Sequence, residues 1–403
     1  MKAARGTTST TTSTTASTTA STTASTTAST TASTTASPRC IQHGPSPRMD
    51  PHMARTRRPA RPDDRGRHAA VHLPDLDIDG YSLSVPDPEA EGFIGDRASQ
   101  TAFRGLVDAA REHHLTARDP FGRKPSRELK KEQIDLVLVR GGLDASHAMH
   151  LAVEEYARQL CYVVQVFMAQ PGWKGVERIV LGGGFPEHQT GGLAMRRAIR
   201  LLELADTGVS LLPLRHDPDE GGLLGWSPLL PQELQRYDAF LAVDIGGTKL
   251  RCGIVEHRLR RDPTGGRGRV LESMVWRHKT DHPDREGAVR RTAAMLNGLA
   301  ALARTMGLKL APFVGIACPG TIEPDGSISA GAQNLPGNWE RPFHLPDALA
   351  SYLEPIDGRA PTVVMHNDAV VQGLSELDRM TDVRRWGVLT IGTGLGNATY
   401  STR

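Results

Sequence analysis

The sequence is short of three things: clustered cysteines, long apolar runs and net charge. Its four cysteines form no CxxC pair, which argues against a zinc knuckle or a disulfide framework and suits a reducing compartment. It contains no run of about 18 apolar residues, and the N-terminus lacks the apolar core of a signal peptide, so we expect a cytoplasmic protein that does not enter the membrane. Lys and Arg (48) nearly balance Asp and Glu (45), and much of the basic excess falls at 55–67, so the charge predicts no nucleic-acid-binding surface elsewhere.

Residues 1–71 have the composition of a tail. Residues 7–37 are almost wholly Thr, Ser and Ala with a repeat of four residues, and residues 55–67 are rich in Arg and Pro. Such segments offer too little apolar surface to offset the entropy of ordering the backbone, so we expect residues 1–71 to be disordered. Met49 and Met53 are alternative start positions, which leaves open whether residues 1–48 are translated.

From residue 72 onward the composition is globular, and patterns typical of strands and helices alternate. Helical spacing of apolar residues and short apolar runs bounded by glycine together predict a mixed α/β fold. The expected helices are 147–170, 192–204, 286–305 and one starting at 369. The expected strands are 177–181, 239–243, 251–256, 313–317, 362–365 and a pair beginning at 386.

One glycine turn follows the apolar strand at 239–243 and reads DIGGTK (244–249). A strand that ends in a carboxylate and turns on two glycines lets the backbone approach a polyphosphate closely. Asp244 could then hold Mg²⁺ through water, and Thr248 could donate a hydrogen bond to phosphate. An ordinary hairpin turn is the alternative. The spacing fits neither a Walker A loop nor a Rossmann fingerprint.

Two further glycine turns, GGG at 182–184 and GTGLG at 392–396, also follow β-rich segments. Each is a weak signal alone. A strand, a glycine turn and a helix can together contact phosphate, because a helix N-terminus presents unpaired N–H groups. The joint occurrence of three such turns favours a nucleotide site.

Three segments in the C-terminal half resemble motifs of the ROK family of sugar kinases and sugar-responsive regulators. They are VGIACPGTI (314–322), QNLPGNW (333–339) and HNDA (366–369), in which His366 stands where the family has Glu. The N-terminal half resembles the remainder of the same family through GFIGDRAS (92–99), the glycines at 182–184 and the segment 219–225. In the family the second group follows the first, so the order of the halves is reversed here.

The resemblance implies a two-lobed actin-like (ribonuclease-H-like) ATPase fold in circularly permuted form. The second, adenosine-side lobe would span 72–215 and be completed by 384–403. The first lobe, on the phosphate and sugar side, would span 216–383.

The resemblance also implies a role for each site residue. Asp368 would be the general base that accepts the proton of the attacking hydroxyl, although an Asp before a helix also suits an N-cap. The expected sugar-contacting residues are Asn334, Asn367 and Gly320. The expected nucleotide-contacting residues are Asp244, Gly246, Gly247, Thr248, Lys249, Gly392, Thr393, Gly394, Gly183 and Gly184, with Asp244 also the Mg²⁺ residue.

The implied activity is that of a glucokinase-like phosphotransferase, which uses ATP and Mg²⁺ to phosphorylate a hydroxyl of a hexose or amino-hexose. A non-catalytic sugar- or nucleotide-binding pseudo-kinase is the alternative. An acetate-kinase or ATPase type fits the loop at 334–339 poorly. Residues 1–71 show no helical periodicity for a DNA-binding domain, and the resemblance leaves a homodimer open.

This sequence departs from the family pattern in one feature. Many family members carry Glu-x-Gly-His followed by a Cys-rich zinc loop beside the sugar site. His72 is the candidate for that histidine, but residues 79–94 hold no cysteine, so structural zinc is not expected. An ordinary surface histidine is the other interpretation of His72.

Overall fold

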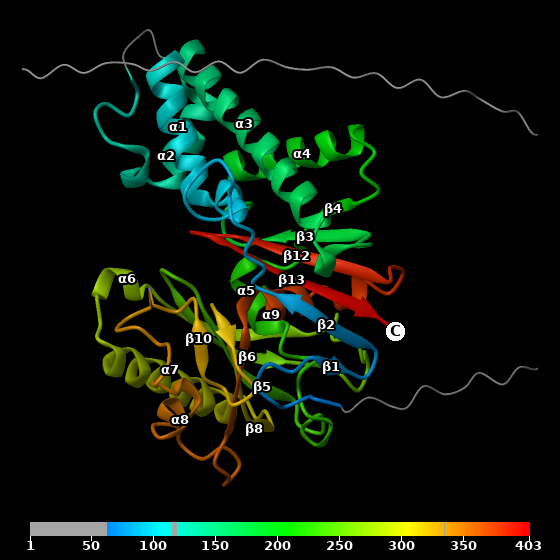
Figure 1. The fold of residues 1–403 in the computed structure, drawn as a ribbon. Helices are drawn as coiled ribbons and strands as arrows, with labels where there is room; N and C mark the ends of the chain where they lie inside the picture. The colour runs from blue at the N-terminus through cyan, green and yellow to red at the C-terminus, as the bar shows by residue number, and fades with distance from the viewer. Residues whose placement is uncertain (1–62, 115–118, 334) are drawn as a thin grey trace, which may run out of the picture. The chain divides into compact units, whose positions relative to one another are not determined.

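Two β-sheets organise the described part of the chain, which comprises residues 63–114, 119–333 and 335–403 of this computed structural model (Figure 1). One sheet has five strands in the order β11-β8-β5-β6-β7, and the other has six in the order β1-β2-β13-β12-β3-β4. With helices packed on them, these sheets confirm the predicted α/β class. Both lie within one compact unit of the chain.

The five-stranded sheet consists of β5 (Ala239–Ile245), β6 (Leu250–Glu256), β7 (Arg269–Trp276), β8 (Leu310–Cys318) and β11 (Thr362–Asn367). The six-stranded sheet consists of β1 (His72–Leu73), β2 (Leu76–Tyr81), β3 (Arg178–Gly182), β4 (Ser210–Pro213), β12 (Arg385–Ile391) and β13 (Leu395–Thr402). A separate pair joins β9 (Thr321–Ile322) to β10 (Ile328–Ala330). The helices are α1 (Gln100–His114), α2 (Lys131–Arg140), α3 (Leu143–Met168), α4 (Gln189–Leu204), α5 (Pro218–Leu224), α6 (His278–Asp281), α7 (Arg285–Thr305), α8 (Leu345–Ala350) and α9 (Asp368–Leu374).

The five-stranded sheet is buried on both faces except along its edge strand β7, which is mostly exposed. Along β5, Leu241 and Val243 pack with α7 and α8, while Phe240 and Ala242 on the other face pack with α5 and α9. This alternation follows from the two-residue period of a strand. The inner strand β8 is buried at every position, as expected of a parallel strand covered on both sides.

The six-stranded sheet shares one of its two cores with the five-stranded sheet. Ile179 and Leu181 of β3 pack with the helices α1–α4, whereas Val180 of β3 and Val388 of β12 face the other way. That second face packs in the same core as α5 and α9, so these two helices lie between the sheets (Figure 1). Among the described helices, including the 26-residue α3, none has an apolar stretch that could cross a bilayer.

The two sheets have the same strand arrangement but a different order along the chain. In the five-stranded sheet an antiparallel run β5-β6-β7 continues through parallel β8 and β11. In the six-stranded sheet the antiparallel run is β12-β13-β2, and it continues through parallel β3 and β4. The third strand of that run, β2, therefore precedes the first two in the sequence.

The folded part of the chain starts before the predicted boundary at residue 71. Residues 63–71 are packed against the rest of the structure, and Ala70 is only 2% exposed. The amide of Gly66 donates to the carbonyl of Leu229, and that of Ala69 donates to the carbonyl of Met365. The prediction of a disordered tail is wrong for these nine residues, because backbone pairing rather than apolar content holds them; residues 1–62 lie outside the described residues.

Candidate active site

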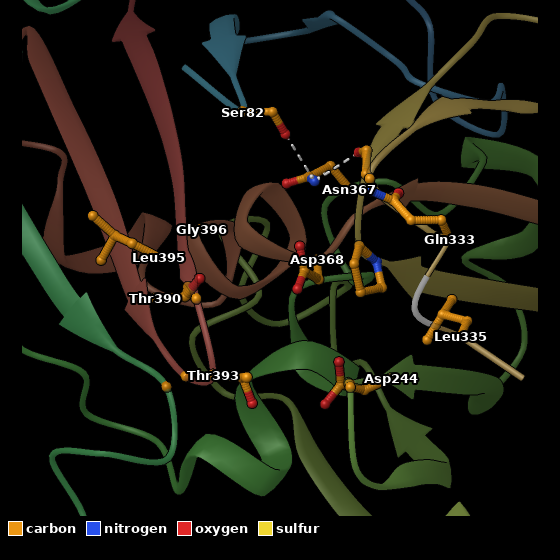
Figure 2. A pocket seen from close by; sticks show the side chains of 18 of the residues that line it. Ser82, Asp244, Gln333, Leu335, Asn367, Asp368, Thr390, Thr393, Leu395 and Gly396 are labelled. Atoms are coloured by element: carbon orange, nitrogen blue, oxygen red, sulfur yellow. Dashed lines mark hydrogen bonds between the residues drawn. The ribbon is translucent and has the colours of Figure 1, made fainter. Parts of the chain in front are cut away.

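A cleft of about 1070 Å³ is lined by segments that are far apart in the sequence. Most of the predicted site residues line it, namely Gly183, Gly184, Asp244, Gly246, Gly247, Gly320, Asn367, Asp368, Gly392, Thr393 and Gly394. Figure 2 shows Asp244 and Asp368 in this cleft together with Thr390 and Thr393. The tertiary structure therefore gathers the three glycine turns and the HNDA segment around one space.

The first glycine turn joins β5 to β6. The amide of Gly246 donates to the carbonyl of Lys249 at 2.9 Å, and Ile245 pairs with Leu250. In this register Asp244 lies directly opposite Arg251, and Arg251 Nη1 donates to Asp244 Oδ2 at 2.6 Å. Arg251 also lines the cleft, so a guanidinium and a carboxylate meet at the end of β5.

Arg251 is part of a larger charge network. Its other terminal nitrogen donates to Asp219 at the start of α5, and Lys249 Nζ lies 3.0 Å from the same carboxylate. The Nε of Arg251 is buried and has no hydrogen-bond partner among the described residues. The network places positive charge beside the first glycine turn and balances it with Asp219 and Asp244.

Thr248 and Lys249 are the two described residues of the predicted set that do not line the cleft. Lys249 instead bonds to Asp219, as described above, and the carbonyl of Thr248 accepts from the amide of Lys279 at 3.4 Å. Asn334 lies outside the described residues. Its neighbours Gln333 and Leu335 line the cleft.

The second glycine turn joins β12 to β13 and carries no ionisable side chain. The amide of Gly392 donates to the carbonyl of Gly394 at 2.9 Å. The N-terminus of α1 anchors the turn, because the amide of Gln100 donates to Gly392 O and the hydroxyl of Thr101 donates to Thr393 O. This side of the cleft offers backbone groups and hydroxyls.

The third glycine turn lies against the second. Gly183 has a φ of 86°, and a Cβ there would lie 2.5 Å from the backbone nitrogen and oxygen of Ile391. Only glycine allows this close approach of β3 to the end of β12. Lys131 Nζ donates to the carbonyl of Gly184 at 2.8 Å and holds the turn from the side of α2.

Asn367 forms the corner between β11 and α9. Its Oδ1 accepts from the amides of Ala369 and Val370, so Asn367 is the N-cap, and the alternative of Asp368 as N-cap is wrong. Its Nδ2 donates to Gly320 O at 2.9 Å and contacts Ser82 Oγ at 3.4 Å (Figure 2). With the cap supplied by Asn367, Asp368 occupies the first helical position and lines the cleft.

The two carboxyl groups of the cleft have raised pKa values. Burial raises the pKa of Asp368 to about 6, although the amide of Ala369 opposes the rise. Burial also raises the pKa of Asp244, and the nearby charge of Asp368 adds to the effect. We expect the ion pair with Arg251 to hold Asp244 ionised more than burial alone would allow. A carboxyl with a pKa near 6 can take up and release a proton at neutral pH.

Segments that the sequence reasoning did not assign to the site also line the cleft. Ser82 and Leu83 directly follow β2, and Phe93, which is 47% exposed, directly precedes the helical turn Ile94–Ala98. The register of the β5–β6 hairpin is a signal that could have identified Arg251, because it pairs with Asp244. Nothing in the local sequence links Ser82 to Asn367.

His72 does not line the cleft. Its Nδ1 lies 2.8 Å from Asp77 Oδ1, one strand away on β2, and its side chain is partly exposed. The interpretation of His72 as a sugar contact therefore has no support from its position, and a surface histidine paired with a carboxylate describes it better.

Similarity to known proteins is partial. No family model matches the sequence, and no curated protein does. Among solved structures, a ROK hexokinase from Thermus thermophilus is 24% identical, with a TM-score of 0.29 over 40% of this chain and 46% of that chain. A ROK family glucokinase from Streptomyces griseus, solved with glucose and AMPPNP, is 25% identical, with a TM-score of 0.30 over 41% of this chain and 45% of that chain.

The chain is thus similar to ROK-family sugar kinases of known structure. The similarity spans slightly less than half the length of each of those chains. At these TM-scores it carries no weight for the activity of this protein, which has to be argued from the cleft.

Proposed function

We propose that this protein is an ATP-dependent sugar kinase that transfers the γ-phosphoryl group to a hydroxyl of a hexose or amino-hexose. The observation that carries the proposal is the common cleft of Asp368 and the glycine turns at 246–247 and 392–394. A protein that only bound a sugar would not need a buried carboxyl of raised pKa in the same cleft as two glycine turns.

We further propose that the fold is a circularly permuted two-lobed actin-like ATPase fold. What supports this is the shared strand arrangement of the two sheets, since β2 is the third strand of the antiparallel run β12-β13-β2 but precedes the other two in the chain. One lobe would comprise residues 72–215 with 384–403, and the other residues 216–383. The pairing of β12 with β3 and of β13 with β2 agrees with that division.

In the proposed reaction, an acceptor hydroxyl of the sugar attacks the γ-phosphorus of ATP. A bond forms between the sugar oxygen and the phosphorus, and the bond from phosphorus to the bridging oxygen breaks, so that ADP leaves. Asp368 accepts the hydroxyl proton and later releases it to solvent. The backbone groups of Gly246, Gly247 and Gly394 would cradle the phosphates, and Arg251 would offset part of their charge.

The donor set of the cleft fits Mg²⁺ held through water. Asp244 and Asp368 both offer carboxylate oxygens, the ligand type that Mg²⁺ prefers, and Arg251 already occupies one oxygen of Asp244. Bound Mg²⁺ would neutralise charge on the phosphates of ATP. We expect Asp244→Asn to raise the Mg²⁺ concentration that gives half-maximal rate and to lower turnover, as measured in Mg²⁺ titrations of the steady-state rate.

The direct test is an ATP-coupled screen of the full chain over hexoses and N-acetylhexosamines, with calorimetric titration of ATP and of each sugar. Turnover of at least one sugar with release of ADP supports the kinase. The absence of turnover across the panel contradicts it.

A pseudo-kinase that binds sugar or nucleotide without turnover is the second candidate. Two contacts favour it: the amide nitrogen of Asn367 already bonds to Gly320, and Arg251 already bonds to Asp244. Calorimetric binding of a sugar or of ATP without any turnover would support this candidate over the kinase.

A further inference from the structure

His366 is fully buried, at 0% exposed, directly before the corner that carries Asn367 and Asp368. Both of its ring nitrogens have partners. The amide of Asn367 donates to Nδ1 at 2.7 Å, and Nε2 lies 2.9 Å from the carbonyl oxygen of Ala70. Because a carbonyl can only accept, Nε2 carries the hydrogen and Nδ1 is the acceptor, which defines a neutral ring in one tautomer.

The partner Ala70 belongs to a segment that crosses between the two sheets, residues 63–71, which we name the strap. The strap runs along β11, which is an edge strand of its sheet. The amide of Ala69 donates to Met365 O, and the amide of Met365 donates to His68 Nδ1, both at 3.1 Å. The strap then leads into β1 and β2 of the six-stranded sheet.

These contacts form a continuous path from the strap to the predicted base. Ala70 binds His366, His366 binds the amide of Asn367, and the side chain of Asn367 caps α9 at Ala369 and Val370. Asp368 lies between the capping residue Asn367 and the first capped amide, that of Ala369. We expect a rotation of the corner that moves the Asp368 carboxylate to lengthen the bond between His366 and the amide of Asn367.

We propose that His366 is a positioning residue that couples the strap to the Asn367–Asp368 corner and so holds the predicted base in place. The expected effect of His366 on catalysis rests on the proposed kinase function. Its expected effect on the conformation of the corner does not. Burial lowers the pKa of His366 to about 4, which keeps the ring in the neutral form that both contacts require. The alternative is that His366 only fills the core beside Tyr81, with which it makes an edge-to-face contact at 5.6 Å.

His257 provides a matched control. It is 2% exposed, its Nε2 lies 2.9 Å from the carbonyl oxygen of Tyr237, and its Nδ1 accepts from the amide of Leu259. The hydrogen-bond pattern is therefore the same as that of His366. His257 follows the far end of β6, about 20 Å along the strand from Arg251 and the cleft.

Three substitutions distinguish a residue that positions the Asn367–Asp368 corner from one that only fills the core. His366→Phe keeps most of the volume and removes both hydrogen bonds, and His257→Phe does the same at the control site. His366→Asn retains a short acceptor that can receive the amide of Asn367 but cannot reach Ala70, so it serves as the conservative variant. It also keeps the test open if His366→Phe does not fold.

The first measurement is amide hydrogen exchange of the full-length parent and variants at residues 367–370. We expect His366→Phe to speed exchange at these residues about 10-fold or more, His366→Asn to speed it less, and His257→Phe to leave it unchanged. Equal protection of residues 367–370 in the parent and in both His366 variants would overturn the inference, whatever the protein catalyses.

The second measurement is kinetic. We expect His366→Phe to lower kcat/KM for the sugar by about 10- to 100-fold, because small displacements of a catalytic group are costly, while KM for ATP changes less than about threefold. His366→Asn should recover part of the loss. His257→Phe should lower Tm without changing either constant. If both Phe variants lose Tm and neither changes the kinetics, His366 is only a core residue.

A failure of the proposed function gives a different result. If the parent phosphorylates no sugar in the panel but residues 367–370 still lose protection in His366→Phe, the kinase proposal fails and the positioning role stands.

Discussion

The β5–β6 hairpin and the β12–β13 hairpin both line the cleft, but with different side chains. In its own sheet, each hairpin joins the first two strands of the antiparallel run. Asp244 is the second-to-last residue of β5, and Thr390 has the same place in β12. Asp244 is paired with Arg251, whereas Thr390 lies opposite Gly396. The first hairpin brings an ion pair to the cleft and the second brings only backbone and hydroxyl groups.

This difference indicates a division of labour between the two sheets. The ionisable groups proposed to act on the phosphates or on the attacking hydroxyl, Asp244, Arg251 and Asp368, all come from the five-stranded sheet and the helix that follows β11. The neutral hairpin opposite can approach a triphosphate without repelling it, because its amides and hydroxyls carry no net charge. The five-stranded side would therefore determine the chemistry, and the six-stranded side would hold the nucleotide.

The largest expected effect tests whether the six-stranded sheet depends on strands from both ends of the folded chain. Deleting residues 384–403 removes β12 and β13 and separates β2 from β3, so we expect loss of cooperative unfolding and of protease resistance for residues 72–215. Limited proteolysis and thermal denaturation measure this. Cooperative folding of residues 72–235 expressed alone, with native protease resistance, would contradict the arrangement.

The next effect tests the charged side of the cleft. Asp368→Asn keeps the shape of the side chain but cannot accept a proton, so kcat should fall by about 10²- to 10⁴-fold while ATP and sugar affinities change only a few-fold. Asp206→Asn is the control, because Asp206 is exposed and has a φ of 46°, which Asn tolerates. Turnover of Asp368→Asn equal to that of the parent would remove Asp368 from the mechanism.

The two hairpins can be compared directly by one substitution in each. Arg251→Met removes the guanidinium beside Asp244, and we expect kcat/KM for ATP to fall by about 10- to 100-fold, because charged hydrogen bonds are lost from a half-buried site. Thr390→Val in the neutral hairpin should cost less than about threefold. Similar losses of kcat/KM for ATP in the two variants, measured by steady-state kinetics, would mean that the charged and the neutral hairpin contribute equally to the reaction.

The last expected effect is on stability as a function of pH rather than on turnover. The folded protein raises the pKa of Asp368 from 3.8 to about 6, so its contribution to stability is present below about pH 4 and is lost as pH rises through about 6. Asp368→Asn removes this loss. Its free energy of unfolding relative to the parent should therefore increase by up to about 3 kcal/mol between pH 4 and pH 7.

Denaturant unfolding at a series of pH values measures that difference, with Asp206→Asn as the control that should show none. A constant difference between Asp368→Asn and the parent across this range would mean that Asp368 ionises as freely in the folded protein as in the unfolded chain.

Local patterns in the sequence predicted the elements and the glycine turns. The expected strand 239–243 corresponds to β5 and the expected helix 286–305 to α7, each within two residues at either end. Strand and helix periodicity depend on which residues face a core, and glycine turns depend on backbone freedom at single positions. Both properties are local, so a single sequence carries them.

Only the tertiary structure decided which distant segments meet. It paired Arg251 with Asp244 across the hairpin, brought Ser82 to Asn367, and packed the strap, predicted as part of a tail, against β11. Such contacts depend on sheet register and on backbone hydrogen bonds between segments up to about 300 residues apart, which leave no periodic signal in either segment. The sequence therefore determined the parts of the cleft, and the packing of the two sheets determined which side chains support them.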